Sequence, residues 1–237
     1  MTDLNDTSTL APDTPFWAIG DVHGRDDLLE ALLTRLMPEG QPIVLVGDYI
    51  NKGPDSAGTL RRLMALADNE QIITLRGNHE ELLLRFLRRP RRFARAFLRF
   101  GGRKTLASFG IAELPEHPAL YQCTQTRNAL LEAMPKLGQW LHSCPYVWQS
   151  GNVSVVHAGA DPDVALDDQP PITFPWGHPN SLTKPRKDGL WVVHGHTPVQ
   201  EVEITQRRIA LDTQAHHTGV LSAVKISSGK AEVLQLP

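Results

Sequence analysis

Five short apolar runs each end in a block of aspartate, histidine or asparagine, and this repeated pattern constrains the fold more than any other feature of the chain. The runs cover residues 16–19, 42–46, 72–75, 153–156 and 191–193, and their length predicts buried strands. In open α/β sheets, ligands bind beyond the carboxyl ends of the strands, so the blocks are expected to meet in one crevice. The blocks are Gly20-Asp21-Val22-His23-Gly24, Gly47-Asp48-Tyr49, Gly77-Asn78-His79-Glu80, His157-Ala158-Gly159 and His194-Gly195-His196.

Helical patterns separate the strands and predict an α/β protein. Helices are expected over residues 26–36 and 54–68, where apolar side chains recur at helical spacing. Further helical segments over 81–110 and 115–142, broken at Pro90 and at Gly101-Gly102, are expected to form a cap beside the site. The chain ends with predicted strands over 208–211, 219–226 and 231–236 and a hairpin turn at 227–230, so a second sheet is expected to pack on the first.

Length and composition predict one domain with a short tail. With 237 residues and 41% hydrophobic composition, the chain can bury one α/β core, which we assign to residues 16–237. Residues 1–15 are polar and are expected to be a flexible tail without a signal peptide, which predicts a cytoplasmic protein. No apolar segment approaches the ~20 residues of a membrane span, so no membrane partner is expected. Cys123 and Cys144 are expected to be reduced thiols without a role.

The residue chemistry of the blocks predicts a centre for two divalent metal ions. Such a centre needs carboxylate, imidazole and amide ligands from several segments, with the ions ~3.5–4 Å apart. Any one of these residues alone would be interpreted as a turn residue or a surface histidine, but five such blocks in order at strand ends favour a metal site. A ligand set without thiolate suits Mn²⁺, Fe or Zn²⁺, and we expect Mn²⁺.

The five blocks in this order resemble the calcineurin-like metallophosphoesterases and, within them, the phosphoprotein phosphatase branch. The resemblance runs from Phe16 to Ser228 and implies an α/β fold: a four-layer β-sandwich of two mixed sheets flanked by helices, with a helical cap. It also implies which six residues are the metal ligands and how they divide between the two ions. Asp21 and His23 would hold one ion, Asn78, His157 and His196 the other, and Asp48 would bridge the two.

The resemblance makes His79 the general acid that protonates the leaving alkoxide, with Asn51 orienting it. Relatives carry Asp-Arg-Gly where this chain has Asn51-Lys52-Gly53, and an amide can orient the imidazole but cannot supply charge. Loss of a nearby carboxylate should lower the pKa of His79, so its acid role weakens and poor leaving groups suffer most. We therefore expect aryl phosphates or phosphoanhydrides to be cleaved relatively better than serine phosphates.

Phosphate binding is assigned by the resemblance to side chains of the same loops: Lys52, Arg76, Asn78 and His178. Lys52 replaces a family arginine, and an ammonium lacks the bidentate fork of a guanidinium. His178 stands in Trp176-Gly177-His178, where relatives often carry Trp-x-Arg, and an ordinary loop histidine is an equal alternative. His194 alternates to the opposite strand face and is expected to be structural.

A basic segment over residues 85–104 holds nine of the 24 arginines and lysines. It could lie at the mouth of the site and attract polyanions. Alternatively, Phe93, Phe97 and Phe100 form a buried stripe and the arginines form its solvated outer face, with aspartates at 161, 163, 167 and 168 as pairing candidates. No motif supports a nucleic-acid partner. The basic residues are Arg85, Arg88, Arg89, Arg91, Arg92, Arg95, Arg99, Arg103 and Lys104.

Together these features predict a metal-dependent phosphomonoesterase that hydrolyses phosphoserine, phosphothreonine or phosphotyrosine in proteins through a hydroxide activated by two metals. One alternative is a symmetrical bis(5'-nucleosyl)-tetraphosphatase, because members of that branch also vary the Asp-Arg-Gly block. Another is a weakly active, phosphate-binding pseudophosphatase, suggested by Asn51, Lys52 and His178 together. The expected partner is a phosphorylated protein or a small phosphoester, and the oligomeric state stays open.

Overall fold

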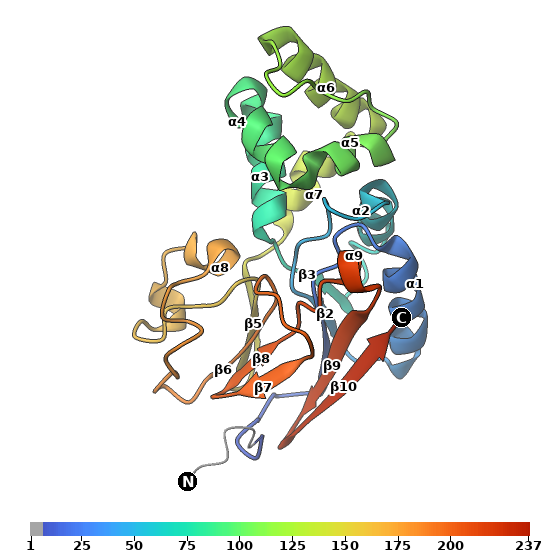
Figure 1. Ribbon diagram of the computed structural model, residues 1–237. Helices are drawn as coiled ribbons and strands as arrows, with labels where there is room; N and C mark the ends of the chain where they lie inside the picture. The colour runs from blue at the N-terminus through green and yellow to red at the C-terminus, as the bar shows by residue number, and fades with distance from the viewer. Residues whose placement is uncertain (1–6) are drawn as a thin grey trace.

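Two β-sheets that pack face to face form the centre of the computed structural model, which describes residues 7–237 (Figure 1). Within those residues each sheet has five strands. The first sheet has the order β10-β9-β1-β2-β3 and consists of β1 (Phe16–Ile19), β2 (Ile43–Leu45), β3 (Ile72–Thr74), β9 (Leu221–Ser227) and β10 (Lys230–Leu236). The second has the order β4-β5-β6-β8-β7 and consists of β4 (Val147–Ser150), β5 (Val153–Val156), β6 (Trp191–His194), β7 (Glu203–Thr205) and β8 (Arg208–Ala210).

The strands that precede the ligand blocks run parallel within each sheet. β1, β2 and β3 pair parallel, as do β5, β6 and β8, whereas β9, β10, β4 and β7 pair antiparallel. The carboxyl ends of β1, β2 and β3 therefore share one edge of the first sheet, and those of β5 and β6 share one edge of the second. The topology brings all five predicted ligand blocks to this end of the sandwich.

The buried side chains divide into layers on either side of the sheets. Phe16 and Ala18 of β1 face the second sheet in an apolar core between the sheets, while Trp17 and Ile19 face the helices on the outside. This alternation is the two-residue period of a strand. A smaller cluster, including Phe174, covers the outer face of the second sheet. The four-layer sandwich expected from the sequence is confirmed.

Helices flank both sheets. α1 (Asp26–Leu36) buries five leucines against the first sheet and carries two aspartates in its first turn, where the helix dipole favours negative charge. α2 (Ser56–Ala65) begins at Asp55, whose Oδ1 accepts the N–H of Gly58 at 2.7 Å. The remaining short helices outside the cap are η1 (Met37–Glu39), η3 (Leu166–Asp168), α8 (Thr173–Trp176) and α9 (Ala215–Thr218).

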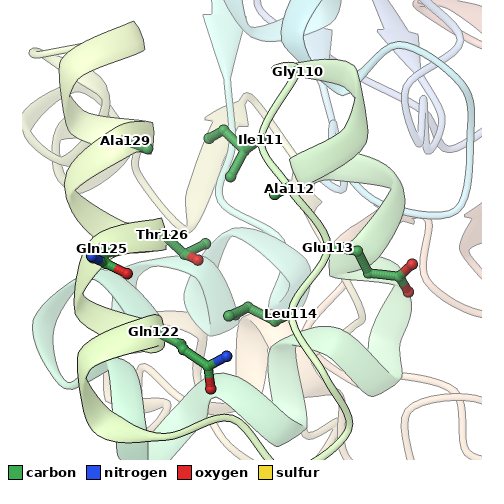
Figure 2. A pocket seen from close by; sticks show the side chains of 9 residues that line it. All are labelled: Gly110, Ile111, Ala112, Glu113, Leu114, Gln122, Gln125, Thr126 and Ala129. Carbon is green, nitrogen blue, oxygen red and sulfur yellow. The ribbon is translucent and has the colours of Figure 1, made fainter.

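The segment between β3 and β4 forms a helical cap, which stands above the carboxyl ends of the strands in Figure 1. As predicted, the helices break at Pro90 and at Gly101-Gly102. A cleft of about 440 Å³ lies within the cap, between residues 110–114 and one face of α6 (Figure 2). Among the described residues, no helix combines the length and apolar character that a membrane span requires. The cap consists of α3 (Asn78–Arg88), α4 (Pro90–Phe97), the π-turn η2 (Leu98–Gly102), α5 (Arg103–Ser108), α6 (Leu120–Ala133) and α7 (Leu137–Ser143).

The phenylalanine stripe expected in the basic segment is only partly formed. Phe97 is buried and stacks on Phe86 with ring centroids 5.1 Å apart. Phe100, however, is 42% exposed, and its ring centroid lies 6.0 Å from that of His79. The reason is the π-turn, which rotates Phe100 away from the helix core. Within residues 7–237, none of the four aspartates considered as partners forms an ion pair with the basic segment.

The described part of the expected N-terminal tail lies against the sandwich. Leu10 is buried in the core between the sheets. Its carbonyl oxygen accepts the N–H of Gly229 at 2.8 Å, and the N–H of Ala11 donates to Asn152 Oδ1 at 2.8 Å. Residues 7–15 are thus anchored, which differs from a loose tail, and residues 1–6 lie outside the described residues.

Candidate metal centre

The loops at the carboxyl ends of the strands hold candidate ligands in a backbone conformation that is rare outside glycine. His23, Asp48 and His196 have φ of 45°, 56° and 62°, and Asn51 and Lys52 have φ of 72° and 56°. Within residues 7–237, five of the eight non-glycine residues with positive φ lie in these loops. Such strain costs on the order of 1–3 kcal/mol per residue and persists where the surrounding structure enforces it, which is typical of functional sites.

Asn78, His157 and His196 converge on one point. Asn78 Oδ1 lies 2.9 Å from His157 Nε2 and 2.9 Å from His196 Nδ1. The other nitrogen of His157, Nδ1, lies 3.1 Å from the carbonyl oxygen of Val46, and because that oxygen only accepts, Nδ1 carries the proton. In the neutral ring, Nε2 then directs a lone pair at another acceptor, Asn78 Oδ1. These three side chains would hold a cation, and its positive charge would offset the repulsion between the two acceptors.

Asp48 lies between two groups of histidines. Its Oδ1 is 3.3 Å from His157 Nε2, and its Oδ2 is 3.5 Å from His23 Nε2. His23 Nδ1 donates to the carbonyl oxygen of Ile50 at 2.8 Å, so its Nε2 also presents a lone pair to the carboxylate. One carboxylate oxygen faces each group, which is the arrangement that a bridging ligand needs.

Three buried carboxylates accumulate negative charge at this place. Burial raises the pKa of Asp21 well above its usual value, and the carboxylates of Asp212 and Asp48 raise it further. Burial acts in the same direction on Asp48, but His157, followed by the other neighbouring histidines, outweighs it and lowers the pKa of Asp48. Asp21 accepts the N–H of His196 at 3.1 Å, and a Cβ on Gly195 would lie 1.8 Å from Asp21 Oδ1, so only glycine fits there. Bound cations would relieve the repulsion among these groups.

Burial keeps the candidate histidine ligands neutral near pH 7. It lowers the pKa of His23 well below the usual value and lowers that of His157. Burial, followed by the neighbouring His157, lowers the pKa of His196 to about 4. Neutral imidazole is the form that binds metal, so these shifts favour ligation.

The donor groups fit two divalent cations. Within residues 7–237, two groups of three candidate ligands come within 4.8 Å of one another: His23, Asp48 and His79, and Asp48, His157 and His196. Asp48 is common to both, and Asn78 joins the second group. When bound, two such cations would lower the pKa of water and supply positive charge for an attack on phosphorus. The first group contains His79 where the sequence predicted Asp21, whose oxygens face the His196 amide, so ligation by Asp21 stays a prediction.

His79, Asn51 and Lys52 meet beside this centre. The backbone N–H of His79 donates to Asp48 Oδ1 at 3.1 Å, and the ring nitrogen Nε2 of His79 lies 3.7 Å from Asp48 Oδ2. On the other side of the ring, Asn51 Nδ2 lies 2.6 Å from His79 Nδ1. Lys52 Nζ lies 2.9 Å from His23 Nε2, so its ammonium group points into the centre. The sequence predicted that Lys52 binds phosphate.

The structure gives Arg76 a different role from the predicted binding of phosphate. Its five N–H groups are all taken up within the protein: three bonds go to the carbonyl oxygens of His142 and Cys144, one to Glu81 at 3.0 Å and one to the hydroxyl of Tyr146 at 3.2 Å. The side chain is buried and ties the loop after β3 to the segment before β4. No donor is left for a phosphate, because a guanidinium has only five.

His178 is likewise not brought to the candidate metal centre. Its Nε2 lies 3.5 Å from Asp161 Oδ2, and its Nδ1 accepts the N–H of Asn180 at 3.3 Å. The residue belongs to the loop after α8, and within residues 7–237 it forms no hydrogen bond or ion pair with a candidate metal ligand. The structure therefore favours the alternative of an ordinary loop histidine.

Glu80 organises the site, although sequence reasoning gave it no role. Its buried carboxylate accepts the N–H groups of Asp48, Tyr49 and Gly77 at 2.8, 2.9 and 3.0 Å. These bonds tie the loop after β2 to the loop after β3, and so fix Asp48 relative to Asn78. The residue stands inside a predicted ligand block, so its position was a usable signal.

Asp212 and His216 are further groups that sequence reasoning missed. Asp212 is buried two residues after β8 and directly after the predicted strand 208–211, the same strand-end position that marked the candidate ligands. The His216 ring centroid lies 5.2 Å from that of His23, and among the described residues its buried Nδ1 has no hydrogen-bond partner. The short helix α9, which no sequence pattern predicted, places His216 there.

A sandwich of two mixed sheets with carboxylate, imidazole and amide groups gathered at the carboxyl ends of its strands defines a metallophosphoesterase. Residues 14–207 match the family model described as calcineurin-like phosphoesterase, and the chain belongs to this family. The family predicted from the five blocks is confirmed.

Relatives with curated names include bis(5'-nucleosyl)-tetraphosphatases. The asymmetrical enzyme PrpE of Geobacillus sp. (strain WCH70) is 27% identical, and the match covers 87% of this chain and 88% of the relative. The symmetrical enzyme of Ralstonia nicotianae is 46% identical over 70 residues, 30% of this chain and 24% of the relative. PrpE of Bacillus subtilis (strain 168) is 28% identical, and the match covers 82% of this chain and 84% of the relative.

Solved structures share the fold. A candidate diadenosine tetraphosphatase superposes with a TM-score of 0.63 at 24% identity and covers 94% of both chains. A cold-active protein-tyrosine phosphatase of a Shewanella species superposes with a TM-score of 0.58 at 17% identity, covering 97% of this chain and 84% of the other. At these identities the likeness concerns the architecture alone.

Proposed function

We propose that the chain hydrolyses a phosphoanhydride bond of bis(5'-nucleosyl) tetraphosphates with the help of two divalent metal ions, for which we favour Mn²⁺. The names of the relatives with long alignments support this substrate class over the phosphoprotein that the sequence first suggested. The observation that carries the proposal is the uncharged partner of His79, since Asn51 stands where a carboxylate would stabilise the imidazolium.

The uncharged Asn51 amide beside His79 determines which leaving groups the site can release. Burial lowers the pKa of His79; the carboxylate of Asp48 opposes this shift, but Lys52 and His196 lower the pKa further, so the net change is downward. Only a small fraction of His79 is then protonated at neutral pH, so full proton transfer to a departing group is weak. A nucleoside polyphosphate is a much weaker base than a serine alkoxide and leaves with little protonation. The site therefore suits an anhydride better than an alkyl phosphoester.

Positive groups at the site suit an anionic substrate. Lys52 projects its ammonium between the candidate ligands and is available to contact a phosphoryl oxygen. Asn78 would contribute a neutral oxygen ligand, so the loaded centre keeps a net positive charge. The basic segment ends at Lys104, next to Thr105, which itself contacts Asn51. An extended polyphosphate chain would thus meet cationic groups beyond the scissile bond.

A second candidate is a phosphotyrosine phosphatase, and Phe100 is the observation that favours it. Its ring is 42% exposed and stands edge-on to His79, at 90° and 6.0 Å between centroids. An aromatic leaving group beside His79 could pack against this ring, and a phenolate also leaves without strong acid catalysis.

The cytoplasmic location expected from the sequence stays a prediction.

The test is a substrate panel on protein loaded with Mn²⁺. Diadenosine tetraphosphate, a phosphotyrosine peptide, a phosphoserine peptide and p-nitrophenyl phosphate are compared by kcat/KM, and the nucleotide products are separated by chromatography. We expect diadenosine tetraphosphate to be the best substrate, with ADP alone indicating symmetrical and ATP plus AMP asymmetrical cleavage. A higher kcat/KM for either peptide would contradict the proposal, and no turnover of any substrate would favour a phosphate-binding pseudophosphatase.

A further inference from the structure

The cap reaches the catalytic loop through a buried hydroxyl. Thr105, on α5, has no exposed surface, and its Oγ1 lies 2.7 Å from Asn51 Oδ1 and 3.0 Å from the Asn51 backbone nitrogen. Ser56, at the start of α2, adds its own hydroxyl, 3.0 Å from the Asn51 nitrogen and 3.1 Å from Thr105 Oγ1. Asn51 is therefore held from the side opposite His79 by two hydroxyl groups.

The protons in this network determine which way the Asn51 amide points. The Asn51 N–H donates to both hydroxyl oxygens, and Thr105 has one proton left to donate. Two acceptors lie within reach of the Thr105 hydroxyl proton, and Asn51 Oδ1 at 2.7 Å is nearer than Ser56 Oγ at 3.1 Å. With Oδ1 engaged there, the NH₂ group of Asn51 faces His79 Nδ1 at 2.6 Å. An NH₂ group only donates, so His79 Nδ1 accepts and the ring proton is on Nε2.

We propose that Thr105 is a positioning residue that, through the Asn51 amide, holds His79 in the tautomer with its proton on Nε2, the nitrogen that faces the candidate metal centre. This nitrogen lies 3.7 Å from Asp48 Oδ2, whereas Nδ1 faces away from the centre. The inference rests on the proposed function only in taking Nε2–H as the hydrogen-bond donor to the leaving oxygen. A reversed amide would offer Oδ1 to an Nδ1–H and leave Nε2 without a proton.

The cap also holds the strained backbone that carries the amide. Asn51 has a φ of 72°, a left-handed conformation that asparagine adopts more readily than most residues. Gly101, with φ of 95°, lies directly against this turn, since a Cβ on Gly101 would be 2.8 Å from the backbone nitrogen of Lys52. The π-turn and α5 therefore fix both the backbone and the side chain of Asn51. A cap residue far along the chain from the ligand blocks thereby sets the proton position at His79.

Substitution of the hydroxyl tests the proposal. Thr105→Val keeps the shape and removes the proton donor, and Thr105→Ser restores it. We expect Thr105→Val to lower kcat on diadenosine tetraphosphate about 10- to 100-fold, with KM and metal content near wild type, and Thr105→Ser to recover activity to within about threefold. Thr126→Val is the matched control, because Thr126 is another buried cap threonine that lines the cleft in Figure 2. It should leave kcat unchanged.

The tautomer itself is measured by ¹⁵N NMR of the histidine rings in Zn²⁺-loaded protein, with His79 assigned by the loss of its signals in a His79→Gln variant. We expect a protonated Nε2 and an unprotonated Nδ1 in the wild type and a shift toward the other tautomer in Thr105→Val. A protonated Nδ1 with an unprotonated Nε2 in the wild type would overturn the inference, and this measurement needs no Thr105 variant to fold. Loss of activity that Thr105→Ser does not recover would also overturn it.

Failure of the proposed function would look different. If wild-type protein hydrolyses p-nitrophenyl phosphate but not diadenosine tetraphosphate, the substrate assignment fails, while the tautomer and the effects of Thr105 substitution are still measurable on the aryl phosphate. If diadenosine tetraphosphate is cleaved but His79 has the other tautomer, the substrate assignment stands and the positioning role of Thr105 is refuted.

Discussion

The contact between Asn51 and His79 makes a quantitative prediction about the leaving group. Asn51 Nδ2 lies 2.6 Å from His79 Nδ1, so Asn51→Asp would place a carboxylate against the imidazole. Opposite unit charges about 4 Å apart attract by about 4 kcal/mol at an effective dielectric constant of about 20, which equals about three pKa units. Burial of the new charge opposes this gain, so we expect the pKa of His79 to rise by about one to two units.

A higher pKa makes His79 a better acid at neutral pH. The protonated fraction should rise about tenfold per unit, and hydrolysis of an alkyl phosphate, which needs the proton, should rise by a similar factor. Hydrolysis of p-nitrophenyl phosphate and of diadenosine tetraphosphate should change less than about threefold, because their leaving groups are weak bases. The alkaline limb of the pH–rate profile for the alkyl phosphate should move upward by about one to two units.

The assay compares kcat/KM for phosphoserine peptide, p-nitrophenyl phosphate and diadenosine tetraphosphate in wild type and in Asn51→Asp at equal metal content. Asn51→Ala is the control, since it removes the amide without adding charge and should not improve the alkyl substrate. Equal ratios of alkyl to aryl hydrolysis in wild type and Asn51→Asp would refute the argument that the missing charge at residue 51 limits acid catalysis.

Three further predictions concern metal binding and stability. Asn78→Ala removes the oxygen shared by His157 and His196, so the bound metal measured by mass spectrometry should fall by about one ion per chain, and an unchanged content would contradict the assignment. Leu10→Ala opens a cavity between the sheets and should lower the free energy of unfolding by about 2–4 kcal/mol in urea titrations, whereas a loss below about 1 kcal/mol would argue against anchoring of residues 7–15. Burial lowers the pKa of His194 to about 4, so its neutral form is favoured in the folded protein. The metal-free protein should therefore be fully stabilised above the unfolded pKa of about 6.5 and lose up to about 3 kcal/mol as the pH falls toward 4, and His194→Gln should reduce this loss.

The sequence determined which elements form and what chemistry the site offers. The side chains of apolar runs such as 153–156 are buried on both faces of the sheet, so these runs form strands. The side chain of Asp55 caps the helix that follows it, so the loop before α2 ends there. Ligand type is a property of single side chains, and strand ends are local features, so Asp48, Asn78 and His157 could be predicted together. The order of five such blocks was enough to predict the family.

Only the tertiary structure decided which of the polar groups are free to act. Arg76 was predicted to bind phosphate, but four of its five donors go to residues about 70 positions further along the chain and the fifth goes to Glu81. His178 meets Asp161, and Phe100 turns outward toward His79 because of a π-turn. Thr105 contacts Asn51 across 54 residues. Hydrogen-bond partners, burial and left-handed loops depend on contacts between distant segments, and local sequence patterns do not encode those contacts.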